Sequence, residues 1–204
     1  MAKQRKLTFE PDYNGYPINT DKEAGLACDT RILNAIERTL DAGLEASSKA
    51  LVFRYDVRLP RTIEETSNEI FKSFQADFCK HLTRKGLKPR YVAVREGDSS
   101  PNPHYHVAMV LDGQKTQNPY GHLQKAGETL ARKLDLPPDR NHGLIHACDR
   151  DYNGQPQPNS YMLTRGGENY DDAFHRLSYL AKVSTKPSDR VRELFVSKRP
   201  RKSK

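Results

Sequence analysis

The chain has 204 residues, of which 35% are hydrophobic and 29% are charged, so it has room for one packed domain with a polar surface. Lysine and arginine exceed aspartate and glutamate by 34 to 26, a formal charge of +8 that favours nucleic acid, then an anionic membrane surface, as partner. No apolar run is long enough to span a membrane, and no apolar core of a secretory signal follows the basic residues of the N-terminus, so we expect no membrane partner.

The first part of the chain predicts an arm followed by a helix. Residues 1–28 are polar and rich in turn-forming residues, so we expect an arm rather than a domain. Asp29 or Thr30 can cap a helix that runs to about Gly43 with apolar residues on one face.

Residues 51–59 alternate as a strand with one apolar and one polar face. The apolar face carries Leu51, Phe53, Tyr55, Val57 and Leu59, and the polar face carries Arg54, Asp56 and Arg58. On an open sheet face, Arg54 and Arg58 could contact nucleic-acid phosphates, although a solvated or ion-paired face explains them equally well.

A long helix is predicted after Pro60. Thr62 and Glu65 match a capping box at its start, and Gly86 would end it. Its apolar stripe follows the three-four spacing of a packed helix and consists of Ile63, Ile70, Phe71, Phe74, Phe78 and Leu82. We interpret these aromatic residues as core.

The remaining elements complete a recognisable order. We expect strands at 91–95, 104–111 and 143–148, helices at 119–134 and from about Asp171, and a loop at 149–169. The first six elements from residue 51 on follow the split βαβ pattern of ferredoxin-like or RRM-like domains. We therefore expect an α+β domain over residues 29–186. Its antiparallel sheet would have helices on one face and a second face free for a ligand, with additional N-terminal and C-terminal helices.

The strand at 104–111 begins with a pair of candidate metal ligands. His104 and His106 point to the same face because side chains on a strand alternate, and imidazole is a common metal ligand. Glu96, at the end of the strand before, would be the third ligand in a site for Mg²⁺ or Mn²⁺. Strict alternation puts Glu96 with Val92 and Val94 on the face expected to be buried. We assume that the alternation relaxes there, and we keep Asp56 as the substitute ligand.

Tyr179 and Lys182 in the last helix are candidates for phosphodiester chemistry. Tyr179 lies roughly opposite the apolar stripe of this helix, and Lys182 is near it in projection. Ionising a phenol with a pKa of about 10 costs roughly 4 kcal/mol at pH 7. Lys182 could favour the phenolate and hold a phosphate oxygen, and a metal ion could polarise the scissile phosphate.

These residues together resemble the HUH endonucleases. More specifically, they resemble the filamentous-phage (inovirus) replication initiators and their prophage relatives, over about residues 15–185. It is carried by the stretches 51–60, Val94-Arg95-Glu96, His104-Tyr105-His106 and the run 176–182 with its Tyr-x-x-Lys. The histidines precede the tyrosine, as in initiators with a single catalytic tyrosine and unlike conjugative relaxases.

The resemblance implies an enzyme that nicks single-stranded or hairpin origin DNA in the host cytoplasm and later rejoins the displaced strand. Tyr179 would take the 5′ phosphate, His104, His106 and Glu96 would hold the metal, and Lys182 would assist. A phosphate loop of the G-x-x-x-x-G-K-[ST] type is absent, so a host helicase would have to unwind the DNA. Three cysteines, odd in number and widely spaced, fit a reducing cytoplasm.

Other interpretations stay open at this point. A transposase would use the same chemistry, and a non-catalytic nucleic-acid-binding domain would present aromatic residues on an open sheet face. His142 and His146 are interpreted as packing or surface residues, and Tyr170 is not expected to be a second nucleophile. Residues 187–204 are expected to form a basic C-terminal tail. Its last seven residues, 198–204, are expected to be solvated, with a phosphate-binding arm as the alternative.

Overall fold

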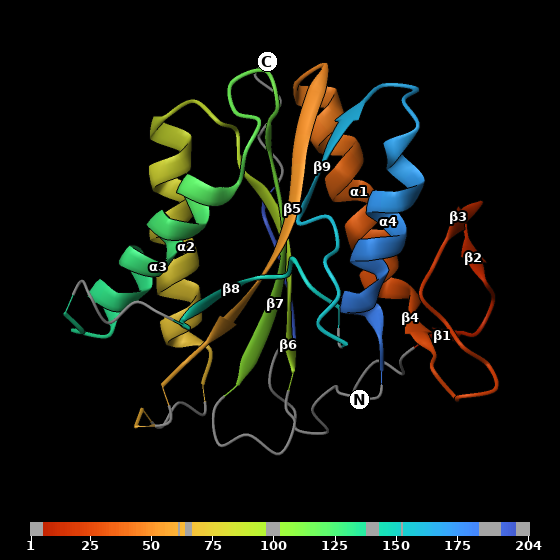
Figure 1. Cartoon of the computed structure of the whole chain (residues 1–204), viewed down its shortest axis with the longest axis horizontal. Coiled ribbons are helices and arrows are strands. Elements are labelled where there is room, and N and C mark those ends of the chain that lie inside the picture. Colours follow the sequence, from red (N-terminus) through yellow and green to blue (C-terminus); the bar gives the residue numbers. More distant parts are fainter. Residues whose placement is uncertain are drawn as a thin grey trace.

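A computed structural model describes residues 6–60, 62–63, 67–96, 103–137, 143–151, 153–183 and 193–198 (Figure 1). Its helices are α1 (Thr30–Ala46), α2 (Glu69–Arg84), α3 (Tyr120–Lys133) and α4 (Asn169–Ser178), and α4 continues into a 3₁₀ turn, Tyr179–Ala181. The longer strands are β5 (Lys49–Arg58), β6 (Arg90–Glu96), β7 (His104–Asp112), β8 (Ile145–Ala147), β9 (Ser160–Thr164) and β10 (Leu194–Val196). The N-terminal segment forms the two-residue strands β1 (Leu7–Thr8), β2 (Asp12–Tyr13), β3 (Tyr16–Pro17) and β4 (Cys28–Asp29).

The central sheet has the strand order β10-β6-β7-β5-β8, and β9 pairs with the other half of β5. Each of these pairings is antiparallel. Along the chain the order is β5, α2, β6, β7, α3, β8, and β7 lies between β5 and β6. This is the split βαβ arrangement, so the predicted α+β fold with an antiparallel sheet is confirmed.

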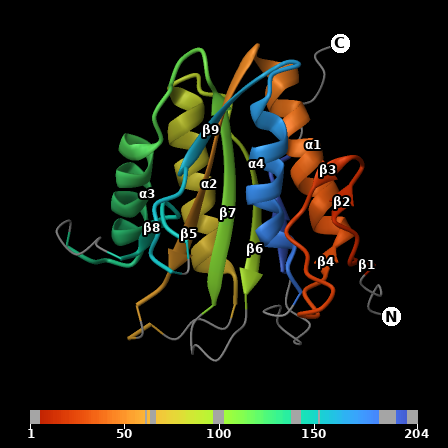
Figure 2. The same ribbon diagram turned by 45° about the vertical axis from the view of Figure 1, so that its right-hand side comes forward.

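Helices cover both faces of this sheet. α2 and α3 lie on one face and α1 and α4 on the other (Figures 1 and 2). The expected open face was therefore wrong. The physical reason is that the second face is also apolar over most of its area and needs cover. Its buried apolar residues on β5, β6, β7 and β9 include Ala50, Val52, Val92, Val94, Ala108, Val110 and Leu163.

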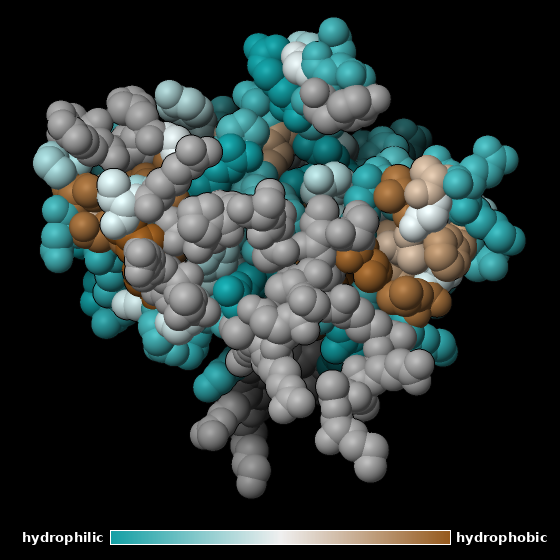
Figure 3. All heavy atoms as spheres, turned by 90° about the horizontal axis from the view of Figure 1, so that it is seen from below, coloured by the Kyte–Doolittle hydropathy of each residue, from teal (hydrophilic) through white to brown (hydrophobic). Residues whose placement is uncertain are grey.

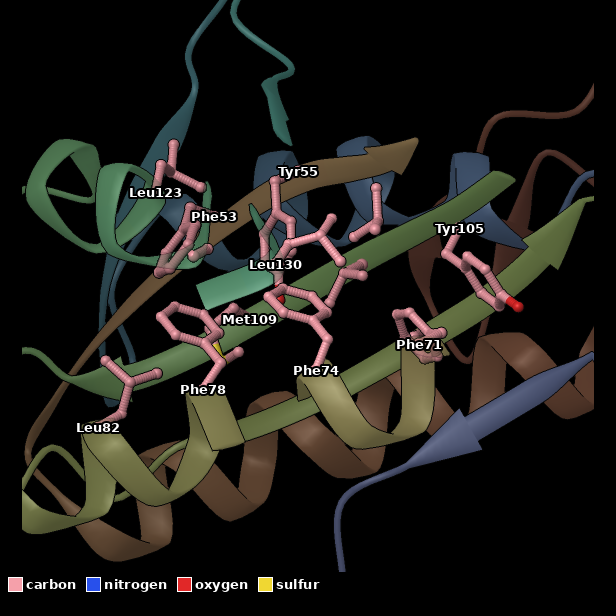
Figure 4. Close-up of a cluster of buried hydrophobic side chains, with 14 of the residues drawn as sticks. Phe53, Tyr55, Phe71, Phe74, Phe78, Leu82, Tyr105, Met109, Leu123 and Leu130 are labelled. Atoms are coloured by element: carbon pink, nitrogen blue, oxygen red, sulfur yellow. The ribbon is translucent and has the colours of Figure 1, made fainter. Parts of the chain in front are cut away.

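The face under α2 and α3 holds the aromatic core predicted from the sequence (Figure 4). Phe71 of α2 stacks on Tyr105 of β7 with ring centroids 4.0 Å apart. α2 begins at Glu69, so the predicted start at the Thr62 capping box was wrong. The amide of Ile63 instead bonds to the carbonyl of Pro60 in a turn, and Glu65 lies outside the described residues. Gly86, with φ of +72°, follows the helix end as predicted.

Two strands lie where a loop and a tail were expected. β9, inside the expected loop, pairs with Lys49–Phe53 of β5, next to the pairing of β8 with Tyr55–Val57 of the same strand. β9 thereby covers backbone groups of β5 that would otherwise form an open sheet edge. Within the expected C-terminal tail, β10 pairs with β6 and Phe195 is 4% exposed, so residues 194–196 belong to the sheet, whereas residues 199–204 lie outside the described part of the chain.

The N-terminal segment packs on the α1–α4 side of the molecule. β1 pairs with β4, and Ile18 and Cys28 are buried in the same core cluster as α1 and α4. Seen from the end at which β5 and β6 finish, the coloured surface is largely hydrophilic, with apolar areas to either side (Figure 3). Leu7 and Phe9 are exposed apolar residues of the N-terminal segment. Within the described ranges, no helix is both long and apolar enough to cross a lipid bilayer.

The close packing of α1 on β7 predicts that a larger residue at Gly43 lowers stability. A Cβ at Gly43 would lie 2.5 Å from Cγ1 of the buried Val110. We expect Gly43→Ala to lower the free energy of unfolding by about 1–3 kcal/mol, although alanine is the better helix former. Gly121→Ala in α3 is the matched control, because a Cβ there meets no atom within 4 Å. Urea unfolding of both variants measures this, and an unchanged Gly43→Ala midpoint would contradict the close packing.

Candidate active site

Strand register brings the predicted metal ligands to one face of the sheet. Asp56 of β5 lies opposite His106 of β7, and Glu96 of β6 lies opposite His104. Directly opposite residues point to the same face, so all four side chains converge where β5 and β6 end. Glu96 keeps strict alternation with Val92 and Val94, and no relaxation is needed, because their face is also that of the histidines.

His106 lies between two carboxylates. Its Nδ1 is 2.6 Å from Oδ1 of Asp56, and its Nε2 is 2.8 Å from Oε2 of Glu96. His104 Nε2 is 3.6 Å from Oδ2 of Asp56. Asp56, Glu96 and His106 are each no more than 5% exposed, so these charges interact with little screening by water. The arrangement holds two imidazoles and two carboxylates at the end of the sheet.

The pKa values in this group reflect the close pairing. Burial alone would raise the pKa of Asp56, but His104, His106 and Arg54 hold it well below its usual range. Burial acts to lower the pKa of His106, but the carboxylates of Asp56 and Glu96 raise it above the ordinary value. The protein therefore favours a positive charge between these two carboxylates.

Asp56, His104 and His106 form a group that could bind a metal ion. Their ligating atoms lie within 4.8 Å of one another. Nitrogen and oxygen donors at this spacing suit a divalent cation. Asp56, the substitute in the sequence prediction, contacts both histidines. Glu96, the first choice, contacts His106 from the other side.

Tyr179 lies beside this group. Its ring stands edge to face with His106, with centroids 5.6 Å apart. Tyr179 begins the 3₁₀ turn that follows α4, so the expectation that it lies within the last α-helix was wrong by one residue. The turn is anchored by buried Leu180 and Ala181 and by a bridge between Lys182 and Cys28. This anchoring fixes the half-buried ring at the site.

Two cations lie over the ring of Tyr179. The guanidinium carbon of Arg54 is 4.2 Å from the ring centroid, and Nζ of Lys182 is 4.7 Å from it. Burial raises the pKa of Tyr179, while Arg54 acts to lower it and the carboxylates of Glu96 and Asp56 raise it further. The phenol is therefore neutral at pH 7. The sequence analysis assigned stabilisation of the phenolate to Lys182 alone. In the structure Arg54 also lies at the ring and acts to lower the pKa of Tyr179.

Arg54 and Arg58 do not lie on an open sheet face. Arg54 is 7% exposed, and its Nη2 is 3.3 Å from Oδ1 of Asp56. Arg58 is exposed at the end of β5, where its Nε is 3.4 Å from Nε2 of His104. The predicted DNA contact by Arg54 assumed an open sheet face, but α1 and α4 cover this face. A DNA contact by Arg58 stays a prediction.

Cys148 and His146 were not predicted as site residues. His146 lies opposite Asp56 in the β5–β8 pairing, and Sγ of Cys148 is 3.2 Å from Oδ1 of Asp56. Burial raises the pKa of Cys148 to about 12, so without a bound ion it is a protonated thiol and a poor nucleophile. Their His-x-Cys spacing on a strand was the sequence signal that could have placed both on one face.

Tyr170 is occupied elsewhere. Its hydroxyl donates a hydrogen bond to Oδ1 of Asp41, and its ring packs on Tyr16 with centroids 4.8 Å apart. These contacts give it a structural role on α4, and the expectation that it is not a second nucleophile stays a prediction. His142 lies outside the described residues.

Comparison with known proteins places the chain in a family. The family model named YagK/YfjJ C-terminal domain matches residues 8–196, which is most of the sequence. The chain belongs to the YagK/YfjJ C-terminal domain family. The match covers every element of the site in this family member, from β5 to the Tyr179 turn. No curated protein and no solved structure matches the chain.

The two carboxylates of this YagK/YfjJ family member give a test of ligand identity. Asp56 contacts both histidines, so we expect Asp56→Asn to weaken Mn²⁺ binding at least about tenfold. Glu96→Gln keeps the size of the side chain. It should weaken Mn²⁺ binding only a few-fold, because Glu96 contacts His106 and is not one of the three grouped ligands. Calorimetric titration of Mn²⁺ into each variant measures this. The reverse order of effects would assign the third ligand to Glu96.

Proposed function

We propose that this protein is a metal-dependent endonuclease and strand transferase of the HUH type. It would cut one DNA strand and initiate rolling-circle replication of a phage or prophage-like element. The observation that carries the proposal is the position of Tyr179. A potential nucleophile lies against His106 of the candidate metal group, with Arg54 and Lys182 at its ring.

In the proposed reaction, the phenolic oxygen of Tyr179 attacks the phosphorus of a DNA phosphodiester. A bond forms between this oxygen and phosphorus, and the bond from phosphorus to the 3′ oxygen breaks. The phenol loses its proton, and the departing 3′ oxygen gains one. The products are a 5′ phosphate joined to Tyr179 and a free 3′ hydroxyl. Attack of a 3′ hydroxyl on the phosphotyrosine reverses these bond changes and joins two ends.

The side chains around Tyr179 would have different roles in this reaction. Arg54 favours the phenolate, and Lys182 is close enough to neutralise a phosphate oxygen beside the ring. Asp56 and Glu96 hold His106 from both sides and so fix its orientation. A divalent ion, Mg²⁺ or Mn²⁺, would polarise the scissile phosphate and stabilise its added negative charge.

The non-catalytic alternative has less support. It needs aromatic residues on an open sheet face, whereas Tyr55 and Tyr105 of the central strands are buried under α2 and α3. Transposition uses the same chemistry and differs in the DNA that is cut. Replication is the proposed role, with a host helicase to unwind the DNA, and the identity of the cleaved DNA discriminates between the two.

The test uses the full chain and a randomised pool of single-stranded DNA carrying a label at the 3′ end. With Mn²⁺ we expect a labelled protein band that survives denaturing electrophoresis and disappears with a chelator. The same pool labelled at the 5′ end should give free labelled fragments and no labelled protein. Sequencing the captured DNA then identifies the cut site. A complete lack of labelled protein would contradict the proposal, and labelled protein from the 5′-labelled pool would reverse the polarity.

A further inference from the structure

Strand β8 brings a second set of ligating side chains to Asp56. Asp56 lies between two partners, with His106 of β7 on one side and His146 of β8 on the other. Cys148, two positions after His146, is on the same side of the chain. The ligating atoms of Asp56, His146 and Cys148 lie within 4.8 Å of one another. This set is separate from the two histidines of the His-x-His pair.

Contacts from another element hold Cys148 in this place. Its carbonyl oxygen accepts a hydrogen bond of 2.8 Å from Nη2 of Arg176 in α4, and its side chain is buried. Its Sγ points at Oδ1 of Asp56, at 3.2 Å. His146 is exposed, so an ion can reach the group from solvent on that side. The group is therefore both ordered and accessible.

The donor set differs in chemistry from that of the His-x-His group. A thiolate, an imidazole and a carboxylate form a sulfur, nitrogen and oxygen set that selects zinc-like ions over Mg²⁺ or Mn²⁺. The guanidinium of Arg54, 3.3 Å from Asp56, opposes any cation nearby. An ion that bonds strongly to sulfur can offset this repulsion, and a hard ion held only by oxygen and nitrogen is less able to do so.

We propose that Asp56, His146 and Cys148 form a second divalent-ion site that binds Zn²⁺ and shares Asp56 with the His104–His106 group. Three protein ligands leave a fourth position of a tetrahedral ion for water or another group. On binding, the thiol loses its proton to solvent and the sulfur bonds to the ion. The inference concerns ion binding alone and does not depend on the proposed nuclease activity.

The experiment is a Co²⁺ titration of the metal-free full chain, with Co²⁺ as a spectroscopic substitute for Zn²⁺. A thiolate ligand gives an intense ultraviolet charge-transfer absorption that nitrogen and oxygen ligands do not give. We expect this band to saturate at one ion per chain and to be lost when Zn²⁺ is added. A titration without the band would overturn the inference.

Variants separate this site from the rest of the protein. Cys148→Ser should lose the band, whereas Cys79→Ser, which changes a partly exposed cysteine on α2, should retain it. His146→Ala changes an exposed side chain, so it should fold normally and bind Co²⁺ at least about tenfold more weakly. His104→Ala should keep the band. A band that survives Cys148→Ser, an unchanged Co²⁺ affinity in His146→Ala, or a band that is lost in Cys79→Ser would overturn the assignment.

Discussion

Replacing Tyr179 by phenylalanine should abolish formation of the covalent protein–DNA product. The change removes only the hydroxyl oxygen and leaves the ring against His106, Arg54 and Lys182. Loss of a nucleophile lowers the rate of covalent catalysis by at least about a thousandfold, which here means no detectable labelled protein. The assay is denaturing electrophoresis with the 3′-labelled DNA pool and Mn²⁺. Thermal unfolding should change little, because the half-buried ring stays in place.

Tyr170→Phe is the matched control for this experiment. It removes the same atom from a tyrosine of the preceding helix, where the hydroxyl bonds to Asp41. The cost should be about 1 kcal/mol of stability, with no loss of covalent product. Labelled protein that persists in Tyr179→Phe but disappears in Tyr170→Phe would move the nucleophile to Tyr170. Persistence in both variants would rule out both tyrosines.

Replacing His104 by alanine should separate cleavage from DNA binding. His104 contacts Asp56 and Arg58 at the edge of the group and is less buried than His106. Alanine at position 104 should therefore disturb the packing less than alanine at position 106. We expect the rate of covalent product formation with Mn²⁺ to fall at least about a hundredfold. DNA affinity should stay within about threefold of the original, because contacts of lysine and arginine with phosphates supply most of the binding free energy.

The measurement pairs the cleavage assay with fluorescence anisotropy on the same oligonucleotide. His81→Ala serves as the control, because His81 lies on α2 at the opposite face of the sheet and should affect neither quantity. Full cleavage by His104→Ala would remove this histidine from the proposed reaction. A parallel loss of cleavage and of DNA affinity would instead show that His104 contributes to binding.

The split βαβ order could be read from the sequence because hydrophobic period and turn residues are local properties. The alternation of 51–59 and the aromatic stripe of α2 each specify one apolar face, and both faces meet in the core as predicted. The start of α2 could not be read in the same way. The Thr62 capping box is a valid local signal, but the connection from β5 needs a turn there, and the helix begins later.

For the site, the sequence by itself determined which residues could carry the chemistry. The His-x-His spacing fixes two imidazoles on one face of any strand, and the Tyr179–Lys182 spacing keeps those side chains close on any helical turn. Glu96 was placed on the face of Val92 and Val94 by alternation alone. The structure keeps this placement, so the assumption that the alternation relaxes at Glu96 was wrong, because the face of Val92 and Val94 is also that of the histidines.

Only the tertiary structure decided that these local sets meet. The register of β5 against β7 and β8 puts Asp56 between His106 and His146, and no local pattern encodes a register between strands far apart in sequence. The packing of α4 on the second sheet face carries Tyr179 to His106 and buries Arg54 beside it. The ligand types were thus present in the local sequence, whereas their distances, burial and shared charge arise from long-range packing.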